Sequence, residues 1–236
     1  MNYQQIFKRY EIKYLLTMQE KEFILEAMKP YMRLDQYGHS TIRNVYFDTD
    51  TFRLIRRSLE KPIYKEKLRV RSYKAAKDKD NVFVELKKKY QSVVYKRRLV
   101  LAQSQALECF QKNLPLPVNS QIADEIEYFR NYYKPLYPKV FISYEREAYG
   151  TIDGSDFRVT FDENILYRED DFSFASEIYG VPILNEGETL MEIKAPSAIP
   201  LWMSRQLTEM QLFKTSFSKY GIAYQDIFRN GGLKYA

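Results

Sequence analysis

The chain has 236 residues, of which 45% are hydrophobic and 29% charged, a composition that excludes wholesale disorder and suits one large domain or two small ones. Its 37 Lys and Arg residues against 31 Asp and Glu residues give a net charge of +6, which favours an anionic partner. A single cysteine, Cys109, and a single histidine, His39, exclude an intrachain disulfide, a cysteine-based zinc cluster and a multi-histidine metal site. Any metal must therefore be held by Asp and Glu oxygens, which suits Mg²⁺, Mn²⁺ or Ca²⁺.

The first predicted elements are a strand over residues 5–15 and a helix after Thr17. Thr17 and Glu20 have the spacing of a capping box, in which each residue bonds the backbone of the other. Apolar residues including Ile24 and Met28 then recur at helical spacing. No apolar run reaches the ~20 residues needed to cross a bilayer, and the start lacks a signal-peptide core. We therefore expect a cytoplasmic protein.

Strands dominate the rest of the chain, and helices separate only some of them. Without regular alternation of strand and helix, the pattern predicts an α+β fold with an antiparallel sheet or barrel rather than a doubly wound fold. The further predicted elements are strands at 41–48, 63–73, 81–90 and 92–101, helices at 103–113 and 120–133, strands at 137–149, 156–166 and 188–195, and a helical region at 199–229.

The predicted strands share one design, because neighbouring side chains on a strand point to opposite faces. In residues 65–71, one face is entirely cationic, whereas the other contains Leu68 and Val70. The other strands repeat the pattern, with cations and a few carboxylates on one face. The polar faces hold Arg9, Glu11 and Lys13; Lys65, Lys67, Arg69 and Arg71; Glu85, Lys87 and Lys89; Tyr144 and Arg146; Arg158, Thr160 and Asp162; and Glu192 and Lys194.

A single polar strand face is typical of an antiparallel sheet that is solvated on one side. The repetition argues for more than that, because like charges side by side on a sheet are destabilising unless an anion offsets them. If the sheet curls into a barrel, these faces line a channel suited to a polyanion, since guanidinium groups bind phosphate oxygens bidentately. The interspersed glutamates could hold a divalent cation that bridges neighbouring phosphates.

Nine segments in order resemble those of a known family: RYEIKYLL, RNVYFDTD, KLRVRSY, FVELKKKY, YKRRLV, SYEREAY, RVTFDENI, LMEIKAP and TSFSKYG. The chain resembles VTC domains, the polyphosphate polymerase domains of the triphosphate tunnel metalloenzyme (CYTH-like) superfamily, over about residues 5–225. The resemblance implies a single domain over residues 1–236, built as a closed antiparallel β-tunnel of about eight strands with flanking helices. It also implies that the tunnel binds triphosphate and a divalent metal, Mn²⁺ or Mg²⁺.

Strand position and the resemblance together give the candidate site residues, which we divide by the role that the resemblance implies. The expected catalytic set is Lys13, Arg69, Arg71, Lys87, Arg146 and Lys219. The expected substrate-binding set is Lys67, Glu85, Lys96, Arg97, Tyr144, Arg158, Lys194 and Ser218, where Lys96 and Arg97 are alternatives for one basic position. Glu192 is the expected metal ligand. Because Arg9 stands where the superfamily's ExExK motif begins with glutamate, the metal site would be leaner and hydrolase activity is less expected.

The implied reaction is transfer of the γ-phosphoryl group of ATP to a growing polyphosphate, with release of ADP. This chemistry depends mainly on positioning and charge neutralisation, so it needs no histidine or serine nucleophile. The alternatives are a metal-dependent tri(poly)phosphatase, a non-catalytic polyphosphate or pyrophosphate sensor, and a basic RNA-binding domain, although no nucleic-acid partner is expected. Export of the product would need a membrane partner protein.

Simpler roles stay open for five of these residues. Arg69 and Arg71 could form only surface salt bridges. Ser218 could be only the N-cap of the final helix. Glu192 could form a structural ion pair with Lys194 or a neighbouring cation. Tyr144 could be a packing residue whose hydroxyl happens to form a hydrogen bond.

Overall fold

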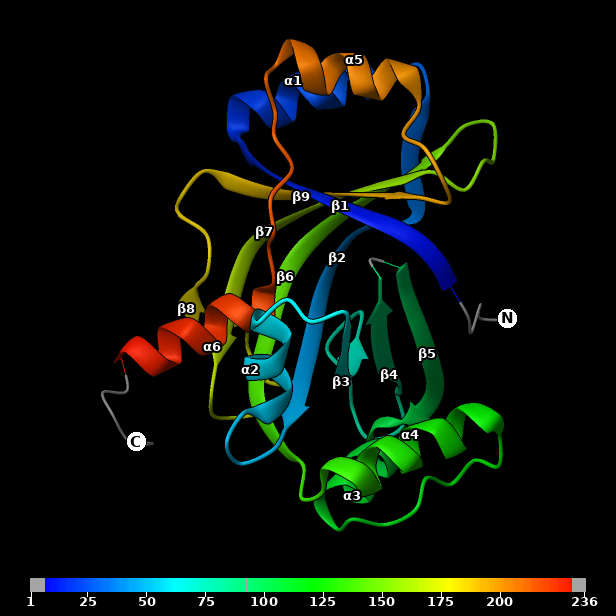
Figure 1. Cartoon of the computed structure of the whole chain (residues 1–236), viewed down its shortest axis with the longest axis vertical. Helices are drawn as coiled ribbons and strands as arrows, with labels where there is room; N and C mark the ends of the chain where they lie inside the picture. Colours follow the sequence, from blue (N-terminus) through cyan, green and yellow to red (C-terminus); the bar gives the residue numbers. More distant parts are fainter. Residues whose placement is uncertain (1–6, 92, 231–236) are drawn as a thin grey trace.

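A computed structural model describes residues 7–91 and 93–230, which form nine strands and six helices (Figure 1). The predicted α+β class and antiparallel sheet are confirmed. In chain order the elements are β1 (Phe7–Thr17), α1 (Met18–Met28), β2 (Met32–Asp48), α2 (Arg53–Leu59), β3 (Tyr64–Ser72), β4 (Asn81–Tyr90), β5 (Val93–Ala102), α3 (Gln103–Gln111), α4 (Gln121–Tyr133), β6 (Tyr137–Thr151), β7 (Arg158–Arg168), β8 (Val181–Pro182), β9 (Glu188–Ala195), α5 (Leu201–Glu209) and α6 (Lys219–Asn230).

All nine strands belong to one sheet with the order β6-β2-β3-β4-β5-β1-β9-β7-β8, and β6 also pairs with β7. The two long strands β2 and β6 pair from Met32 opposite Thr151 to Asp48 opposite Tyr137. The first strand, β1, lies between β5 and β9, and so joins the N-terminal region to the C-terminal one. These pairings place the strands that carry the charged motifs next to one another.

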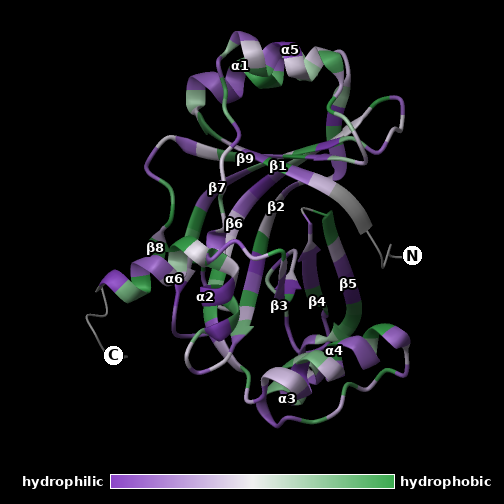
Figure 2. Cartoon of the chain, in the orientation of Figure 1, coloured by the Kyte–Doolittle hydropathy of each residue, from purple (hydrophilic) through white to green (hydrophobic). Residues whose placement is uncertain are grey.

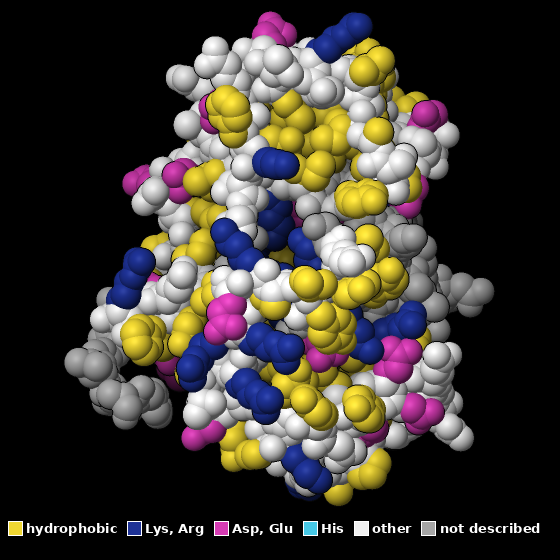
Figure 3. Space-filling model, viewed as in Figure 1, with side chains coloured by type: hydrophobic (Ala, Val, Ile, Leu, Met, Phe, Trp, Pro, Cys, Tyr) yellow, Lys and Arg dark blue, Asp and Glu magenta, His cyan; other side chains and the backbone are white. Residues whose placement is uncertain are grey.

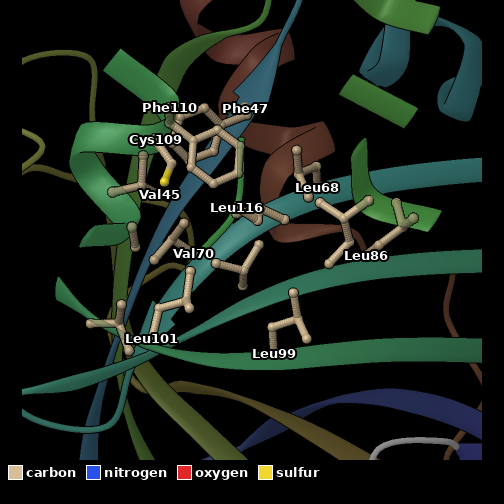
Figure 4. Packing of buried hydrophobic residues seen from close by; sticks show 14 of the residues in the cluster. Val45, Phe47, Leu68, Val70, Leu86, Leu99, Leu101, Cys109, Phe110 and Leu116 are labelled. Carbon is tan, nitrogen blue, oxygen red and sulfur yellow. The ribbon is translucent and has the colours of Figure 1, made fainter. Parts of the chain in front are cut away.

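Hydrophilic and hydrophobic residues are mixed along the strands (Figure 2), and the alternation of side chains places the apolar ones on one face of the sheet. Leu68, Val70 and Leu86 are completely buried on the face that packs against α3 and α4. Figure 4 shows this packing, in which Cys109 and Phe110 of α3 lie against the strand side chains. Burial of a Leu or Val side chain is worth about 1.5–3 kcal/mol, so this face holds the helices on the sheet.

Two further helix pairs cover other parts of the sheet. α1 and α5 lie together at the top of Figure 1 and form a second apolar cluster with β1, β7 and β9. The predicted capping box is present at the start of α1, where Thr17 and Glu20 bond each other's backbone N–H groups. α2 and α6 form the third cluster, which includes Tyr46 and Tyr144 of the sheet. Among the described residues, no helix is both long and apolar enough to span a bilayer.

The structure differs from the sequence predictions in four places, one of which is the two-residue strand β8, which was not predicted. Strand β2 begins at Met32, nine residues before the predicted start, and an irregular register between Leu34 and His39 interrupts its pairing with β6. The short helix α2 was not predicted. The region predicted as helical over 199–229 contains two helices, because residues 210–218 cross between α5 and α6 without helical structure. Residues 5–6 and 92 of the predicted strands lie outside the described residues.

Candidate functional site

The charged motifs meet on the face of the sheet opposite the α3–α4 cluster, which we call the polar face. Figure 3 shows a hollow near the centre of the molecule in which Lys and Arg side chains gather. Cations outnumber carboxylates in this group, which is drawn from eight strands and the start of α6. Its members are Glu11, Lys13, Asn44, Tyr46, Lys67, Arg69, Arg71, Glu85, Lys87, Lys96, Arg98, Tyr144, Arg146, Asp162, Glu192, Lys194, Ser218 and Lys219.

Glu85 of β4 is the centre of the first cluster and is completely buried. Its carboxylate accepts hydrogen bonds from Arg69 Nε at 2.9 Å and from Arg98 Nε at 2.8 Å, and Lys96 Nζ lies 3.5 Å away. Burial alone would raise the pKa of Glu85, but the cations around it, Arg69 foremost, outweigh burial and hold the pKa well below the usual range. Glu85 is therefore an anion that fixes the positions of several cations.

Arg71 of β3 is oriented by neutral groups. Its Nε donates to Asn44 Oδ1 at 2.8 Å and its Nη2 to the Tyr144 hydroxyl at 3.0 Å. The same hydroxyl lies in a strongly positive environment: burial would raise the pKa of Tyr144, but the charges of Arg146 and Arg71 lower it to about 8. Within the described part of the chain, the contact of 3.9 Å to Glu85 is the one carboxylate contact of Arg71, so its guanidinium group can also bind a ligand anion.

Asp162 of β7 forms the second carboxylate cluster, on the other side of Tyr144. Arg146 of β6 binds it with two hydrogen bonds, of 2.6 and 2.7 Å, and Lys219 of α6 donates to Oδ2 at 2.6 Å. Asp162 is completely buried, and the charges of Arg146 and Lys219 overcome burial and lower its pKa. Sequence reasoning placed Asp162 on the polar face but gave it no role, although its position beside the predicted arginine is visible in the strand alternation.

Residues 215–219 connect the C-terminal region to the centre of the polar face. Lys13 Nζ donates to the Phe217 carbonyl at 2.8 Å, and the Thr215 N–H donates to the Lys13 carbonyl at 2.7 Å. Ser218 Oγ accepts from Lys67 Nζ at 2.8 Å and from the Gly221 N–H at 3.0 Å. Ser218 therefore caps the first turn of α6 and also contacts the lysine group. Burial lowers the pKa of Lys13 to about 8, against the effect of Glu192.

Among the four carboxylates named in the polar-face group, Glu11 and Glu192, on the paired strands β1 and β9, have the fewest close contacts with cations. Glu11 accepts from Lys87 at 2.5 Å, and Glu192 lies 3.8 Å from Lys194 Nζ. No group of three or more acidic, His or Cys side chains suited to a metal occurs among the described residues. Mg²⁺ is often bound by one or two carboxylates with substrate phosphates and water supplying the rest. The two glutamates therefore fit a divalent metal that binds together with phosphate, rather than one held by protein alone.

The structure brings together all but two of the predicted site residues. Lys96 faces Glu85, whereas Arg97 points to the opposite face of β5 and donates to Glu125 of α4 at 3.1 Å. We therefore remove Arg97 from the site, and Arg98, which has the same orientation as Lys96, joins it. Arg158 is exposed at the start of β7, opposite Lys194 in the neighbouring strand. The sequence analysis did not identify Arg98 as a site residue, nor the ion pair between Glu11 and Lys87.

A model of the VTC domain family matches residues 8–228. The chain belongs to the VTC domain family. The resemblance inferred from the nine sequence segments is thereby confirmed. No match was found among curated protein sequences.

Two solved structures share the fold of this VTC domain. One is a protein from Bacillus halodurans described as a candidate adenylate cyclase, with 14% identity, a TM-score of 0.59 and coverage of 91% of this chain and 96% of that one. The other is a Hippeastrum protein described as a candidate adenylyl cyclase with a dominant triphosphatase activity, with 14% identity, a TM-score of 0.54 and coverage of 98% and 97%. Similarity at this level of identity establishes a common fold.

Proposed function

We propose that this VTC domain is a polyphosphate polymerase that transfers the γ-phosphoryl group of ATP to a polyphosphate chain. In this proposal residues 1–236 form one domain, and the strands from β6 through β2 and β9 to β7 close into a tunnel. The pairing of β6 with both β2 and β7 supports closure, because β6 and β7 then join the two ends of the strand order. Because ATP is the donor, we place the reaction in the cytoplasm.

The tunnel cations account for substrate binding. Arg69 and Arg71 lie two residues apart on β3, and both side chains point to the polar face. A guanidinium group matches two phosphate oxygens at once, whereas an ammonium group acts as a point charge. We assign the direct contacts to the transferring phosphates to Lys13, Arg69, Arg71, Lys87, Arg146 and Lys219, and further phosphate contacts to Lys67, Lys96, Arg98, Tyr144, Lys194 and Ser218.

The close contacts between the carboxylates and the cations favour a polymerase over a hydrolase. Glu85 and Asp162 are each bound by cations that lower their pKa, and the pKa values of Glu11 and Glu192 are also lowered. A carboxylate with a low pKa is a poor general base for water. The terminal phosphate of a polyphosphate chain needs no such base, because its second pKa is about 6 and it is largely ionised at neutral pH.

In the proposed step, a terminal oxygen of the acceptor chain forms a bond to the γ-phosphorus of ATP. The bond between that phosphorus and the β–γ bridging oxygen breaks, and ADP leaves with the electron pair. The fixed cations stabilise the charge that spreads over the transferring group, and they need no rearrangement during the reaction. Glu192 and Glu11 would hold Mn²⁺ or Mg²⁺ together with phosphate oxygens, and the metal would add positive charge next to the transferring group.

The test is to incubate the protein with ATP and Mn²⁺ or Mg²⁺ and to resolve the products by gel electrophoresis and phosphorus NMR. We expect long phosphate chains and ADP, and we expect EDTA to abolish the reaction. A Glu85→Gln variant tests whether the fixed positions of the cations matter, because it removes the anion that holds Arg69, Lys96 and Arg98 but none of these cations. Free phosphate as the main product from tripolyphosphate would overturn the proposal.

A hydrolase is the second candidate, because the Hippeastrum protein of the same fold is described as a triphosphatase. It predicts release of phosphate from tripolyphosphate at a rate comparable to turnover of ATP. Tight binding of tripolyphosphate with unchanged substrate would instead indicate a sensor.

A further inference from the structure

One end of the β3–β4 hairpin carries lysines that face one another. On the polar face, Lys67 lies opposite Lys87 and Lys65 lies opposite Lys89. Like charges directly opposite each other on paired strands are destabilising. Lys87 is relieved by its bond to Glu11. Within residues 7–91 and 93–230, however, no ion pair with a carboxylate joins Lys65, Lys67 or Lys89.

Lys65 connects these lysines to the end of α2, at the surface of the molecule. Its Nζ donates to the Ser58 carbonyl at 3.1 Å, near the end of α2. Burial lowers the pKa of Lys65 first, and the positive charges of Lys89 and Lys61 lower it further. Lys61 is exposed just beyond α2. We call Lys61, Lys65 and Lys89 the lysine strip.

The lysine strip differs from the centre of the site in its charge balance. At the centre, buried carboxylates compensate part of the cationic charge, as Glu85 does for Arg69. Among the residues that the structure describes, no carboxylate forms an ion pair with the strip, so its positive charges repel one another until an external anion binds. Lys65 lies four residues from Arg69 along β3, roughly 13 Å at the usual rise of a strand. Three phosphate groups held at Arg69 and Arg71 would not extend that far, whereas a longer chain would.

We propose that the lysine strip is the path along which a long polyphosphate chain leaves the central site, and that it binds long chains but not triphosphate. This inference rests on the proposed function for the identity of the chain.

The experiment compares the double variant Lys65→Gln/Lys89→Gln with the wild-type chain. Binding of tripolyphosphate and of polyphosphate of about one hundred units is measured by titration calorimetry at two salt concentrations. We expect the double variant to lose at least about tenfold in affinity for the long chain and part of its salt dependence, because two phosphate contacts are lost. Affinity for tripolyphosphate should stay within about twofold.

The matched control is Lys29→Gln/Lys112→Gln, which removes two exposed lysines directly after α1 and α3 and changes the net charge equally. It should bind both ligands as the wild type does. The urea midpoint of the Lys65→Gln/Lys89→Gln variant should be equal to or above that of the wild type, since a repulsive pair is removed. If that variant does not fold, Lys61→Gln, which is exposed, provides the same long-chain measurement with a smaller expected loss.

The outcomes separate the two proposals. Unchanged long-chain affinity in the double variant would overturn the strip, whatever the chain synthesises. Selective loss of long-chain affinity in a protein that makes no polyphosphate would support the strip and overturn the polymerase. If a single-stranded RNA of the same charge competes equally with polyphosphate, the strip does not distinguish polyphosphate from RNA, and its assignment to polyphosphate is overturned.

Discussion

Two glutamates on opposite sides of the β4–β5 pair illustrate how this fold uses the same residue types differently. Glu85 lies on the polar face, is 0% exposed and is surrounded by arginines and Lys96. Glu125 of α4 lies on the other side, is 22% exposed in its side chain and accepts bonds from Lys88 and Arg97. On β5, Arg97, which binds Glu125, lies in sequence between Lys96 and Arg98, which contact Glu85. Alternation along a strand therefore assigns one cation to attach a helix and the next to a buried charge cluster.

The comparison predicts very different contributions to stability. Replacing Glu85 by Gln leaves several buried cations without their anion, and we expect a loss of roughly 3–5 kcal/mol in the free energy of unfolding. Glu125→Gln should cost about 0–1 kcal/mol, because its ion pairs are partly solvated. Urea denaturation of both variants measures the difference. Tripolyphosphate should restore part of the stability of Glu85→Gln, because a bound anion stabilises the folded state. Equal losses in the two variants would contradict this, because they would show that the cluster around Glu85 contributes no more to stability than the partly solvated ion pairs of Glu125.

The second prediction concerns ligand affinity. Arg71→Ala removes a guanidinium group that Asn44 and Tyr144 hold in place, and we expect tripolyphosphate to bind about 30- to 100-fold more weakly, the usual loss for one or two charged hydrogen bonds. Arg97→Ala removes the same group from the outer face and should change affinity less than about twofold. Calorimetric titration of both variants tests this. Intact binding in Arg69→Ala and Arg71→Ala would contradict the assignment of the site itself.

The smallest expected effect is a dependence on pH. Burial lowers the pKa of Lys13 to about 8 and that of Lys96 to about 7. Both side chains therefore lose positive charge as the pH rises from 7 to 9, and we expect the affinity for tripolyphosphate to fall by roughly tenfold over this range. In Lys96→Arg, which stays charged, the decline near pH 7 should flatten. An equally steep decline in that variant would assign the effect to another group.

The same lysines have the opposite effect on the stability of the free protein. An unfolded lysine has a pKa near 10.4, so above pH 7 the unfolded chain binds more protons than the folded chain. Stability then rises with pH across this window. Urea midpoints of the ligand-free protein at pH 7 and 9 check the sign.

Much of the site was predictable because strand alternation needs no knowledge of tertiary structure. It placed Arg69 and Arg71 on one face, and Leu68 and Val70 on the other. The choice between Lys96 and Arg97 was not predictable in the same way, because it depends on register. Tyr90 pairs with Val93, which puts Lys96 opposite Lys87 and Arg98 opposite Glu85.

The elements that sequence reasoning missed depend on tertiary contacts. The first half of β2 contains an irregular pairing between Leu34 and His39, so it shows no clean alternation. α2 has seven residues, too few for a periodic pattern, and its first turn is fixed by Asp48, which accepts from the Leu54 and Ile55 N–H groups. The break between α5 and α6 depends on the bridge between Thr215 and Lys13. The sequence around Thr215 cannot indicate this contact, because its partner Lys13 lies near the other end of the chain.

The position of β1 between β5 and β9 has a consequence for biosynthesis. Tyr10 pairs with Ala195 and Thr17 with Glu188, so one side of β1 stays without its neighbour until most of the chain has left the ribosome. Contacts between such distant segments slow folding, because the loop must close before the contact is gained. An unpaired strand edge during that interval is open to association with other chains. We therefore expect the sheet to close only after β9 has been synthesised. Until then, the unpaired edge of β1 must be protected from association with other chains.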